Sequence, residues 1–337
     1  MRALVLKQPG EAAVEIVPDP VRRPEEVWLK VRRVGLCGSD LNSFRGKNPL
    51  VTFPRIPGHE IAATVVEAST VRPDLTEGTC VAVSPYSCCG SCPSCRRGRP
   101  NACQFNQTMG VQRDGGLTEF IQVPPEKIFP GNLSISELCI VEPLTVGFHA
   151  VERGKVTAAD TVAVIGCGGV GLGAIAGAGF RGARVIAIDV QSEKLEIARK
   201  AGASHLINTA SETLRKRLHE LTDGRGPDVV IEAVGRPETF RAAVELVAFS
   251  GRVIYIGYAK EDVCYETRLF VQKELEILGS RNAVANNFRE VIQMLEQARF
   301  PVADYITAVV ALETAAVMLH RWSEHPDEFT KIIVRLD

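Results

Sequence analysis

The stretch TVAVIGCGGVG, from Thr161 to Gly171, decides the fold of this chain. Its first half is apolar and rich in β-branched residues, which is typical of a short buried strand. Its second half has the spacing G-x-G-x-x-G, formed by Gly166, Gly168 and Gly171, and a segment rich in alanine, glycine and isoleucine follows. The pattern predicts a strand that turns through glycines into a closely packed helix.

The residues after this turn predict a Rossmann dinucleotide-binding unit. A second apolar run, ARVIAID, ends at Asp189, 23 residues beyond Gly166. A strand, this glycine spacing, a helix and a later acidic residue together form the fingerprint of such a site. Gly166 permits the tight turn, Gly168 lets the backbone approach a pyrophosphate, and Gly171 allows helix and strand to pack closely. Free N–H groups at the helix N-terminus would hold the phosphates.

Asp189 favours NAD over NADP, because a carboxylate there accepts hydrogen bonds from the ribose and repels a 2'-phosphate. Lys194 is the nearest following cation, and it either touches the ribose edge or is a solvated helix residue. Further strands and helices alternate after Asp189, which predicts a doubly wound parallel sheet. The turns at Val234 and Gly257 follow strands of this sheet and are expected at the nicotinamide end. The predicted cofactor residues are Gly166, Gly168, Gly169, Val170, Gly171, Asp189, Lys194, Val234 and Gly257.

Composition limits the classes of function. The 337 residues suffice for two domains, and 39 Lys and Arg balance 40 Asp and Glu, a net charge of -1. This balance gives no electrostatic reason to expect nucleic acid or a membrane surface as partner. The uncharged stretch Thr161–Phe180 is long enough to span a bilayer, but seven of its twenty residues are glycine. The N-terminus lacks a signal-peptide core, so we expect a cytoplasmic protein.

Five cysteines gather in one short segment, and four of them have the spacing of a metal site. Cys89, Cys92, Cys95 and Cys103 read C-x2-C-x2-C-x7-C, whereas Cys88 would break the regular interval. Four thiolates close a tetrahedral zinc shell with no open position, which is a structural site. A redox C-x-x-C pair is the alternative. The pattern predicts a zinc-stapled lobe over residues 85–104.

The N-terminal third predicts a β-rich domain of partly barrel-like form, since short apolar runs alternate there with Gly and Pro turns. Metal-ligand residue types occur in GLCGSD (Cys37), PGHE (His59 and Glu60) and VEPLTVG (Glu142). Each motif alone is unspecific. Their joint presence ahead of a dinucleotide-binding unit favours a catalytic metal centre.

These motifs, the four-cysteine lobe, RDGGLTEF and the glycine turn occur in an order that resembles the zinc-containing medium-chain dehydrogenase/reductase family. The resemblance covers essentially the whole chain. It implies a GroES-like catalytic zinc domain of residues 1–146 and 282–337 around a Rossmann domain of residues 147–281. It also implies a second zinc between the domains and a homodimer or homotetramer.

By the same resemblance, Cys37 and His59 are zinc ligands, and Glu60 is a direct ligand or a carboxylate that can swing in. Glu142 stands where the alcohol branch has a cysteine and the polyol branch a glutamate. A bound zinc acidifies an alcohol, and NAD takes the hydride. Ser39 can pass the proton on, but Asn42 stands where the family often has a relay histidine. The onward route of the proton is therefore open.

The substrate class is predicted from Glu142, its VEPLTVGFHA context and the stretch LGSRNA. This combination is similar to galactitol-phosphate dehydrogenases and to L-galactonate and L-gulonate 5-dehydrogenases. Arg281 is the candidate for a substrate carboxylate or phosphate, because a guanidinium matches either. It could equally pack between domains or bind a cofactor phosphate. The alternatives are an L-threonine 3-dehydrogenase, another zinc alcohol dehydrogenase, and a non-catalytic regulator that binds NAD and zinc.

Overall fold

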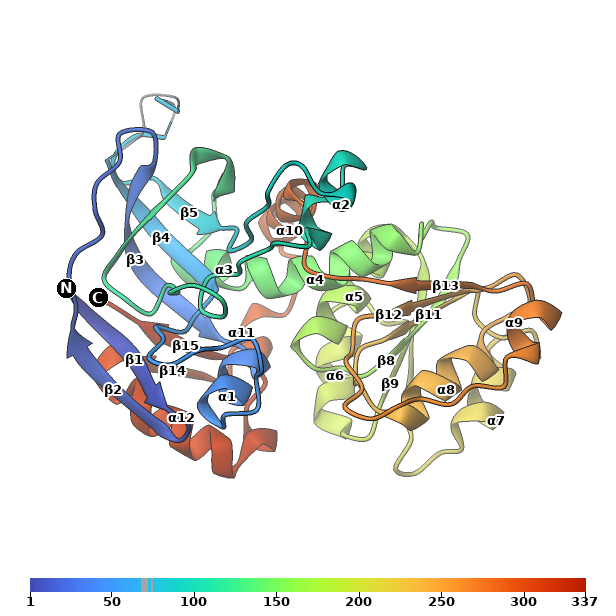
Figure 1. The fold of residues 1–337 in the computed structure, drawn as a ribbon. Coiled ribbons are helices and arrows are strands. Elements are labelled where there is room, and N and C mark those ends of the chain that lie inside the picture. Colours follow the sequence, from blue (N-terminus) through green and yellow to red (C-terminus); the bar gives the residue numbers. More distant parts are fainter. Residues whose placement is uncertain (68–71, 74) are drawn as a thin grey trace. The chain divides into compact units, whose positions relative to one another are not determined.

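The computed structural model describes residues 1–67, 72–73 and 75–337, which form two compact units (Figure 1). Unit 1 comprises Met1–Glu142, Val284–Ile292 and Val302–Asp337, and unit 2 comprises Pro143–Ala283 and Gln293–Pro301. The predicted domains, 1–146 with 282–337 and 147–281, differ from these units mainly in residues 293–301, which pack with unit 2. Both termini lie in unit 1, so the two ends of the chain build one body.

Unit 1 is built on a seven-stranded sheet of order β14-β15-β3-β4-β5-β7, with β6 also paired to β3. A separate antiparallel pair, β1-β2, completes its strands. The strands are β1 Arg2–Gln8, β2 Glu11–Ile16, β3 Val27–Leu36, β4 Glu60–Glu67, β5 Cys80–Val83, β6 Phe120–Val123, β7 Ile128–Pro130, β14 Ala308–Ala311 and β15 Ile332–Arg335. The helices are α1 Gly38–Phe44, α2 Pro93–Arg96, η1 Pro100–Ala102, η2 Pro125–Lys127, α3 Ile135–Cys139, α11 Val302–Tyr305, η3 Leu312–Thr314, α12 Ala315–Glu324 and η4 Pro326–Glu328.

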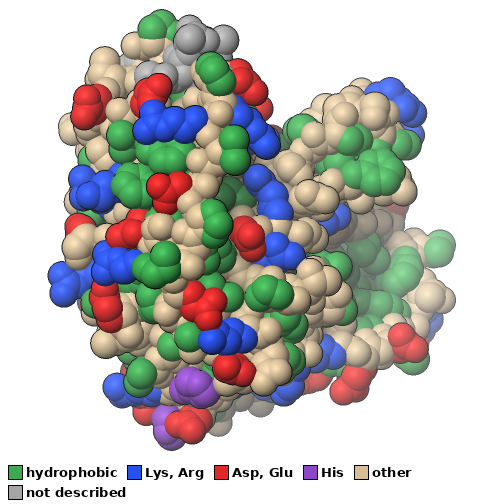
Figure 2. Space-filling model, turned by 60° about the vertical axis from the view of Figure 1, so that its left-hand side comes forward, with side chains coloured by type: hydrophobic (Ala, Val, Ile, Leu, Met, Phe, Trp, Pro, Cys, Tyr) green, Lys and Arg blue, Asp and Glu red, His purple; other side chains and the backbone are tan. Residues whose placement is uncertain are grey.

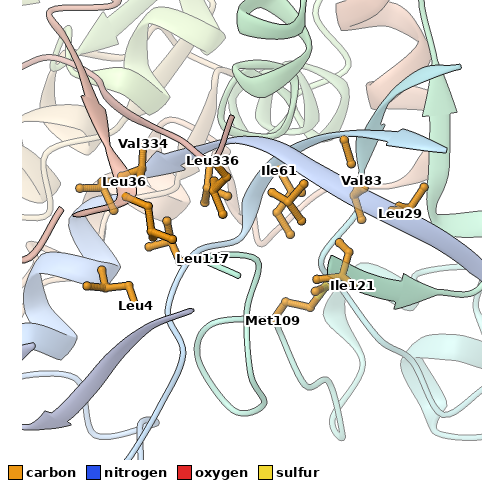
Figure 3. Close-up of a cluster of buried hydrophobic side chains, with 14 of the residues drawn as sticks. Leu4, Leu29, Leu36, Ile61, Val83, Met109, Leu117, Ile121, Val334 and Leu336 are labelled. Carbon is orange, nitrogen blue, oxygen red and sulfur yellow. The ribbon is translucent and has the colours of Figure 1, made fainter. Parts of the chain in front are cut away.

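Apolar side chains from distant segments of the chain fill the core of unit 1. The C-terminal strand β15 pairs antiparallel with β3, which joins residues about 300 positions apart. Figure 3 shows core residues from several parts of the chain: Leu4, Leu29, Leu36, Ile61, Val83, Met109, Leu117, Ile121, Val334 and Leu336. β3 and β4 are the longest strands and most of their residues are buried. Burial of their apolar side chains helps to hold the unit together.

Unit 2 has six parallel strands in the order β10-β9-β8-β11-β12-β13. The strands are β8 Thr161–Ile165, β9 Arg184–Asp189, β10 His205–Asn208, β11 Val229–Glu232, β12 Arg252–Tyr255 and β13 Glu276–Gly279. The helices are α5 Gly169–Phe180, α6 Ser192–Lys200, α7 Leu214–Leu221, α8 Pro237–Leu246 and α9 Arg268–Gln272. Two further helices, α4 Val141–Arg153 and α10 Ala285–Glu296, run from one unit into the other. The predicted doubly wound parallel sheet and the β-rich second body are confirmed.

The uncharged stretch Thr161–Phe180 folds as β8 followed by α5. Among the described residues, no helix combines the length and apolarity that crossing a membrane requires. Figure 2 shows basic and acidic side chains interspersed with apolar and other side chains over the face it presents. Ion pairs on exposed side chains include Arg2 with Glu119 at 2.8 Å and with Glu313 at 2.6 Å.

Candidate functional site

A cluster of potential metal ligands forms in unit 1 where two neighbouring strands meet. Cys37 directly follows β3, while His59 and Glu60 stand at the start of β4. The two strands are antiparallel and pair Gly35 with Glu60, so the end of one lies beside the beginning of the other. The ligand atoms of Cys37, His59 and Glu60 lie within 4.8 Å of one another.

Gly35 is required for this arrangement. A Cβ atom at position 35 would lie 1.9 Å from Oε2 of Glu60, so any side chain there would displace the carboxylate. The glycine in the sequence GLCGSD, two residues before Cys37, therefore makes room for the buried carboxylate of PGHE.

Asp40 holds the backbone on both sides of the cluster. Its Oδ2 accepts a hydrogen bond from the N–H of Cys37 at 2.9 Å, and its Oδ1 accepts one from the N–H of Gly58 at 3.1 Å. Oδ1 also lies 3.8 Å from Nδ1 of His59. Burial opposes the charged imidazole, but the negative charges of Asp40, Cys37 and Glu142 outweigh it and raise the pKa of His59. The pocket therefore favours a positive charge at this position.

Glu60 is paired with a buried cation that sequence reasoning missed. Nζ of Lys331 donates to Oε1 at 2.6 Å and to Oε2 at 2.7 Å, and Glu60 is fully buried. Burial alone would lower the pKa of Lys331, but the charge of Glu60 outweighs it and raises that pKa. Glu60 can thus approach a metal only by sharing or giving up its contact with Lys331.

Glu142 does not belong to the group of three close ligand atoms. It is 4% exposed, and its Oε1 accepts a hydrogen bond from the hydroxyl of Tyr86. Burial raises the pKa of Glu142 to about 7, with His59 acting in the opposite direction and Glu60 in the same one. Since Glu142 and His59 influence each other's pKa, the carboxylate lies close to the cluster without completing it.

The four-cysteine lobe has its sulfurs gathered as the spacing predicts. Cys89, Cys92, Cys95 and Cys103 have Sγ atoms within 4.8 Å of one another, and no disulfide joins them. Backbone N–H groups point at these sulfurs: those of Cys92 and Phe105 donate to Sγ of Cys89 and Cys103, both at 3.3 Å. Backbone hydrogen bonds at Ser91 and Cys92 lower the pKa of Cys89 to about 6. Cys88 is exposed and lies outside the group.

Ser39, which is predicted to pass the proton on, and Asn42, which stands where the family often has a relay histidine, both lie on α1. Ser39 has a buried Oγ with no hydrogen-bond partner among the described residues. The carbonyl oxygen of Ser39 accepts a hydrogen bond from Ser43 Oγ at 2.8 Å. Ser39 therefore has an unsatisfied hydroxyl two residues after Cys37, which suits a donor or acceptor on a bound ligand. Asn42 lies on the same helix and offers an amide, not a titratable group.

The predicted dinucleotide residues form a tight turn between β8 and α5 in unit 2. Gly166 has φ +98°, and a Cβ at Gly171 would lie 1.8 Å from the carbonyl oxygen of Gly166. Gly168, by contrast, faces open space, since a Cβ there would meet no atom within 4 Å. Gly169 and Val170 begin α5, whose first N–H groups have no partner within the helix. An open glycine backed by a helix N-terminus fits a pyrophosphate.

Asp189, at the end of β9, is hydrogen-bonded to the backbone of this turn. Its Oδ2 accepts from the N–H of Cys167 at 2.7 Å, and its Oδ1 accepts from the N–H groups of Val190 at 2.7 Å and Gln191 at 3.0 Å. A carboxylate has about four acceptor positions, so Oδ2 retains one for a ribose hydroxyl. Lys194 lies half-buried in the first turn of α6. Burial and the charge of Asp189 raise the pKa of Cys167, and the charge of Lys194 opposes this rise.

The loops after β11 and β12 lie side by side. A Cβ at Gly257 would lie 2.4 Å from the backbone N of Gly235, and one at Gly166 would lie 2.7 Å from Cγ2 of Val234. Glu232, fully buried, accepts from the N–H groups of Val234 and Gly235, both at 2.8 Å. Val234 thus lies beside Gly166 of the glycine turn, and Gly257 lies beside Gly235. Arg281 lies exposed in the loop after β13, also in unit 2.

The donor sets fit the expected metal. Four thiols suit structural zinc, and a thiol, an imidazole and carboxylates suit a zinc site with room for a further ligand. When bound there, zinc acidifies an alcohol and NAD accepts its hydride. Lys331 balances the charge of Glu60, and Tyr86 donates a hydrogen bond to Glu142. The Ser39 hydroxyl stays available to a ligand.

Comparisons with known proteins agree with this chemistry. Residues 23–133 match the alcohol dehydrogenase GroES-like domain, and residues 169–297 match the zinc-binding dehydrogenase family. An uncharacterized zinc-type alcohol dehydrogenase-like protein of Haemophilus influenzae is 36% identical, over 98% of each chain. L-galactonate-5-dehydrogenase of Escherichia coli is 30% identical, over 95% of each chain.

Solved structures are similar over the full length. An alcohol dehydrogenase from Escherichia coli CFT073 in complex with NADH has a TM-score of 0.91 at 28% identity and covers 100% of this chain and 99% of its own. Galactitol-1-phosphate dehydrogenase of Escherichia coli also has a TM-score of 0.91 at 28% identity, with complete coverage of both chains. The chain belongs to the zinc-containing medium-chain dehydrogenase/reductase family. It is a zinc- and NAD-dependent dehydrogenase of the alcohol and polyol class.

Proposed function

We propose that the protein oxidises a secondary hydroxyl of an open-chain sugar acid or polyol, of the L-galactonate or L-gulonate type, with NAD. The observation that carries this proposal is the carboxylate of Glu142, buried beside the cluster of Cys37, His59 and Glu60. A carboxylate in place of a second thiolate makes zinc a harder centre, which suits an oxygen-rich ligand such as a vicinal diol. The 30% identity to an L-galactonate-5-dehydrogenase supports the same substrate class.

The site residues follow from this proposal. Cys37, His59 and Glu142 hold the catalytic zinc, with Glu60 as a further ligand or exchange partner. Cys89, Cys92, Cys95 and Cys103 hold the structural zinc. Arg281 reads the substrate carboxylate, and the enzyme acts as a homodimer or homotetramer. The resemblance and the gathered ligand atoms support the two metal sites. The roles of Glu142 and Arg281 and the oligomeric state rest on the resemblance.

Steady-state reduction of NAD over a substrate panel tests the function. The panel contains L-galactonate, L-gulonate, the matching neutral polyols, threonine and ethanol. We expect an aldonate to give the highest kcat/KM. A better rate with threonine or ethanol contradicts the sugar-acid assignment, and no reduction by any compound, with both zinc ions bound, favours a non-catalytic regulator.

Arg281 provides a separate test of carboxylate recognition. A charge-assisted, two-point hydrogen bond contributes about 1.5–3 kcal/mol, so the aldonate should exceed its neutral polyol by roughly ten- to a hundredfold. Arg281→Ala should remove that preference, and the matched variant Arg281→Lys should restore only part of it, because an ammonium lacks the planar fork. An unchanged preference in Arg281→Ala means that another group reads the carboxylate.

A further inference from the structure

Tyr86 is hydrogen-bonded to Glu142 in the interior of unit 1, and this bond has no role in the chemistry proposed above. The tyrosine is 6% exposed and lies between β5 and Cys89, the first of the four gathered cysteines, and its hydroxyl donates to Oε1 of Glu142. Glu142 is itself 4% exposed. A buried carboxylate or hydroxyl that loses a partner pays a desolvation cost, so the two groups stabilise each other.

The tyrosine acts as a fixed neutral donor. Its hydroxyl is the donor to Oε1 of Glu142, because an ionised carboxylate can only accept hydrogen bonds. The hydrogen bond engages Oε1 of Glu142 and thereby sets the direction in which the carboxylate faces. A hydrogen bond of this kind to a ligating carboxylate orients the ligand and adjusts its basicity.

The segment that carries Tyr86 is anchored on both sides of this residue. Ser84 N–H donates to the carbonyl of Lys127 at 2.8 Å, and the carbonyl of Pro85 accepts from the N–H of Met109 at 3.1 Å. Oγ of Ser87 accepts from the N–H of Gln107 at 2.7 Å. Gln107 and Met109 follow Cys103, while Cys89 follows Ser87 by two residues. The segment that follows Cys103 is therefore hydrogen-bonded to the residues on both sides of Tyr86.

We propose that Tyr86 is a positioning residue that directs the carboxylate of Glu142 to the active-site metal, and that the four-cysteine lobe acts on that metal through Tyr86. The inference rests on the proposed role of Glu142 as a metal ligand. It gives the structural zinc of this chain a specific role, because that zinc would fix the loop that supplies the phenol hydroxyl.

The test measures metal binding, not only turnover. Tyr86→Phe keeps the ring and removes the hydroxyl. We expect the affinity of the catalytic site for Co²⁺, measured by competition with a chromophoric chelator, to fall roughly 10- to 100-fold, the usual cost of losing such a partner. The visible absorption bands of the bound Co²⁺ should shift as well, because the ligating carboxylate is reoriented.

The matched control is Tyr255→Phe, which removes a hydroxyl that donates to the carbonyl of Phe240 at 2.9 Å in unit 2. It should leave the Co²⁺ affinity and spectrum unchanged. Glu142→Gln separates the ligand role of Glu142 from the positioning role of Tyr86. If Glu142→Gln does not weaken Co²⁺ binding, the proposed ligand set is wrong; if it does and Tyr86→Phe does not, only the role of Tyr86 is overturned.

The coupling to the lobe is tested in two backgrounds. Ser87→Ala removes one anchor of the loop without touching a cysteine, and Cys95→Ser removes a lobe ligand. Each should weaken Co²⁺ binding at the catalytic site in the native protein but add little in Tyr86→Phe. Effects that multiply in the double variants would show that the lobe acts independently of Tyr86.

Discussion

The buried pair of Lys331 and Glu60 yields the sharpest prediction about the metal site. Lys331→Met removes the cation and keeps most of the volume, which leaves the fully buried carboxylate of Glu60 without its two hydrogen bonds of 2.6 and 2.7 Å. Removing one partner of a buried ion pair costs about 3–5 kcal/mol. Lys331→Met should therefore destabilise the metal-free protein more than the metal-bound protein, because a bound metal would supply the missing positive charge.

The expected consequence is tighter metal binding in the variant. If the metal fully replaces Lys331, affinity at the catalytic site rises by the same free energy that the metal-free protein loses. At about 1.4 kcal/mol per factor of ten, even 3 kcal/mol corresponds to roughly 100-fold. Chelator competition with Zn²⁺ on the native protein and on Lys331→Met measures this ratio, and the contribution of the four-cysteine lobe cancels in the comparison.

Glu60→Gln in the Lys331→Met background is the control. The amide carries no charge that needs a cation, so the gain in affinity should disappear. Urea unfolding with and without zinc gives a second readout, in which the loss caused by Lys331→Met should shrink when zinc is present. An equal loss in both conditions, with unchanged affinity, would mean that Glu60 never reaches the metal.

Three further predictions concern the cofactor turn and the cysteine lobe. Asp189→Asn, which keeps one carbonyl acceptor for the turn, should lower the NAD/NADP ratio of kcat/KM by about tenfold or more, equal to ~1.4 kcal/mol; equal use of both cofactors by the native protein would contradict the assignment. Gly171→Ala should lower the free energy of unfolding in urea by about 1–3 kcal/mol or more, because the added Cβ would lie 1.8 Å from the carbonyl oxygen of Gly166. Gly168→Ala should instead leave the free energy of unfolding unchanged and weaken NADH binding in fluorescence titration. The reverse pattern would exclude pyrophosphate binding at this turn. Cys95→Ser should lose one zinc per chain by metal analysis and Cys88→Ser none, whereas zinc loss in Cys88→Ser would refute the register.

The parallel sheet was predictable from sequence because its signals are local. The glycine turn at Gly166–Gly171 and the apolar runs that form β8 and β9 each specify their own conformation within a few residues. Gly35 shows where such local signals end. The motif GLCGSD alone does not indicate that the carboxylate of Glu60, on β4, will occupy the space beside Gly35 that a side chain would otherwise fill.

Lys331 and Tyr86 could not be predicted because their partners lie far along the chain. Lys331 and Glu60 are 271 positions apart, and Tyr86 and Glu142 are 56 apart. The one local signal for Lys331 is a single lysine at the head of the apolar run KIIVRL, since a charged residue entering a buried strand needs a buried partner. Tyr86 has no comparable signal, because a tyrosine beside a cysteine cluster is equally compatible with simple packing.

The two carboxylates of the site differ in how their charge is balanced. Glu60 faces a full cation, Lys331, so its charge is already compensated without a metal. Glu142 faces a neutral phenol, and its pKa is raised to about 7, mainly by burial. A metal ion therefore relieves a larger unfavourable charge at Glu142 than at Glu60. Under the proposed ligand set, Glu142 is therefore the permanent carboxylate ligand, and Glu60 is the one that approaches the metal when Lys331 releases it.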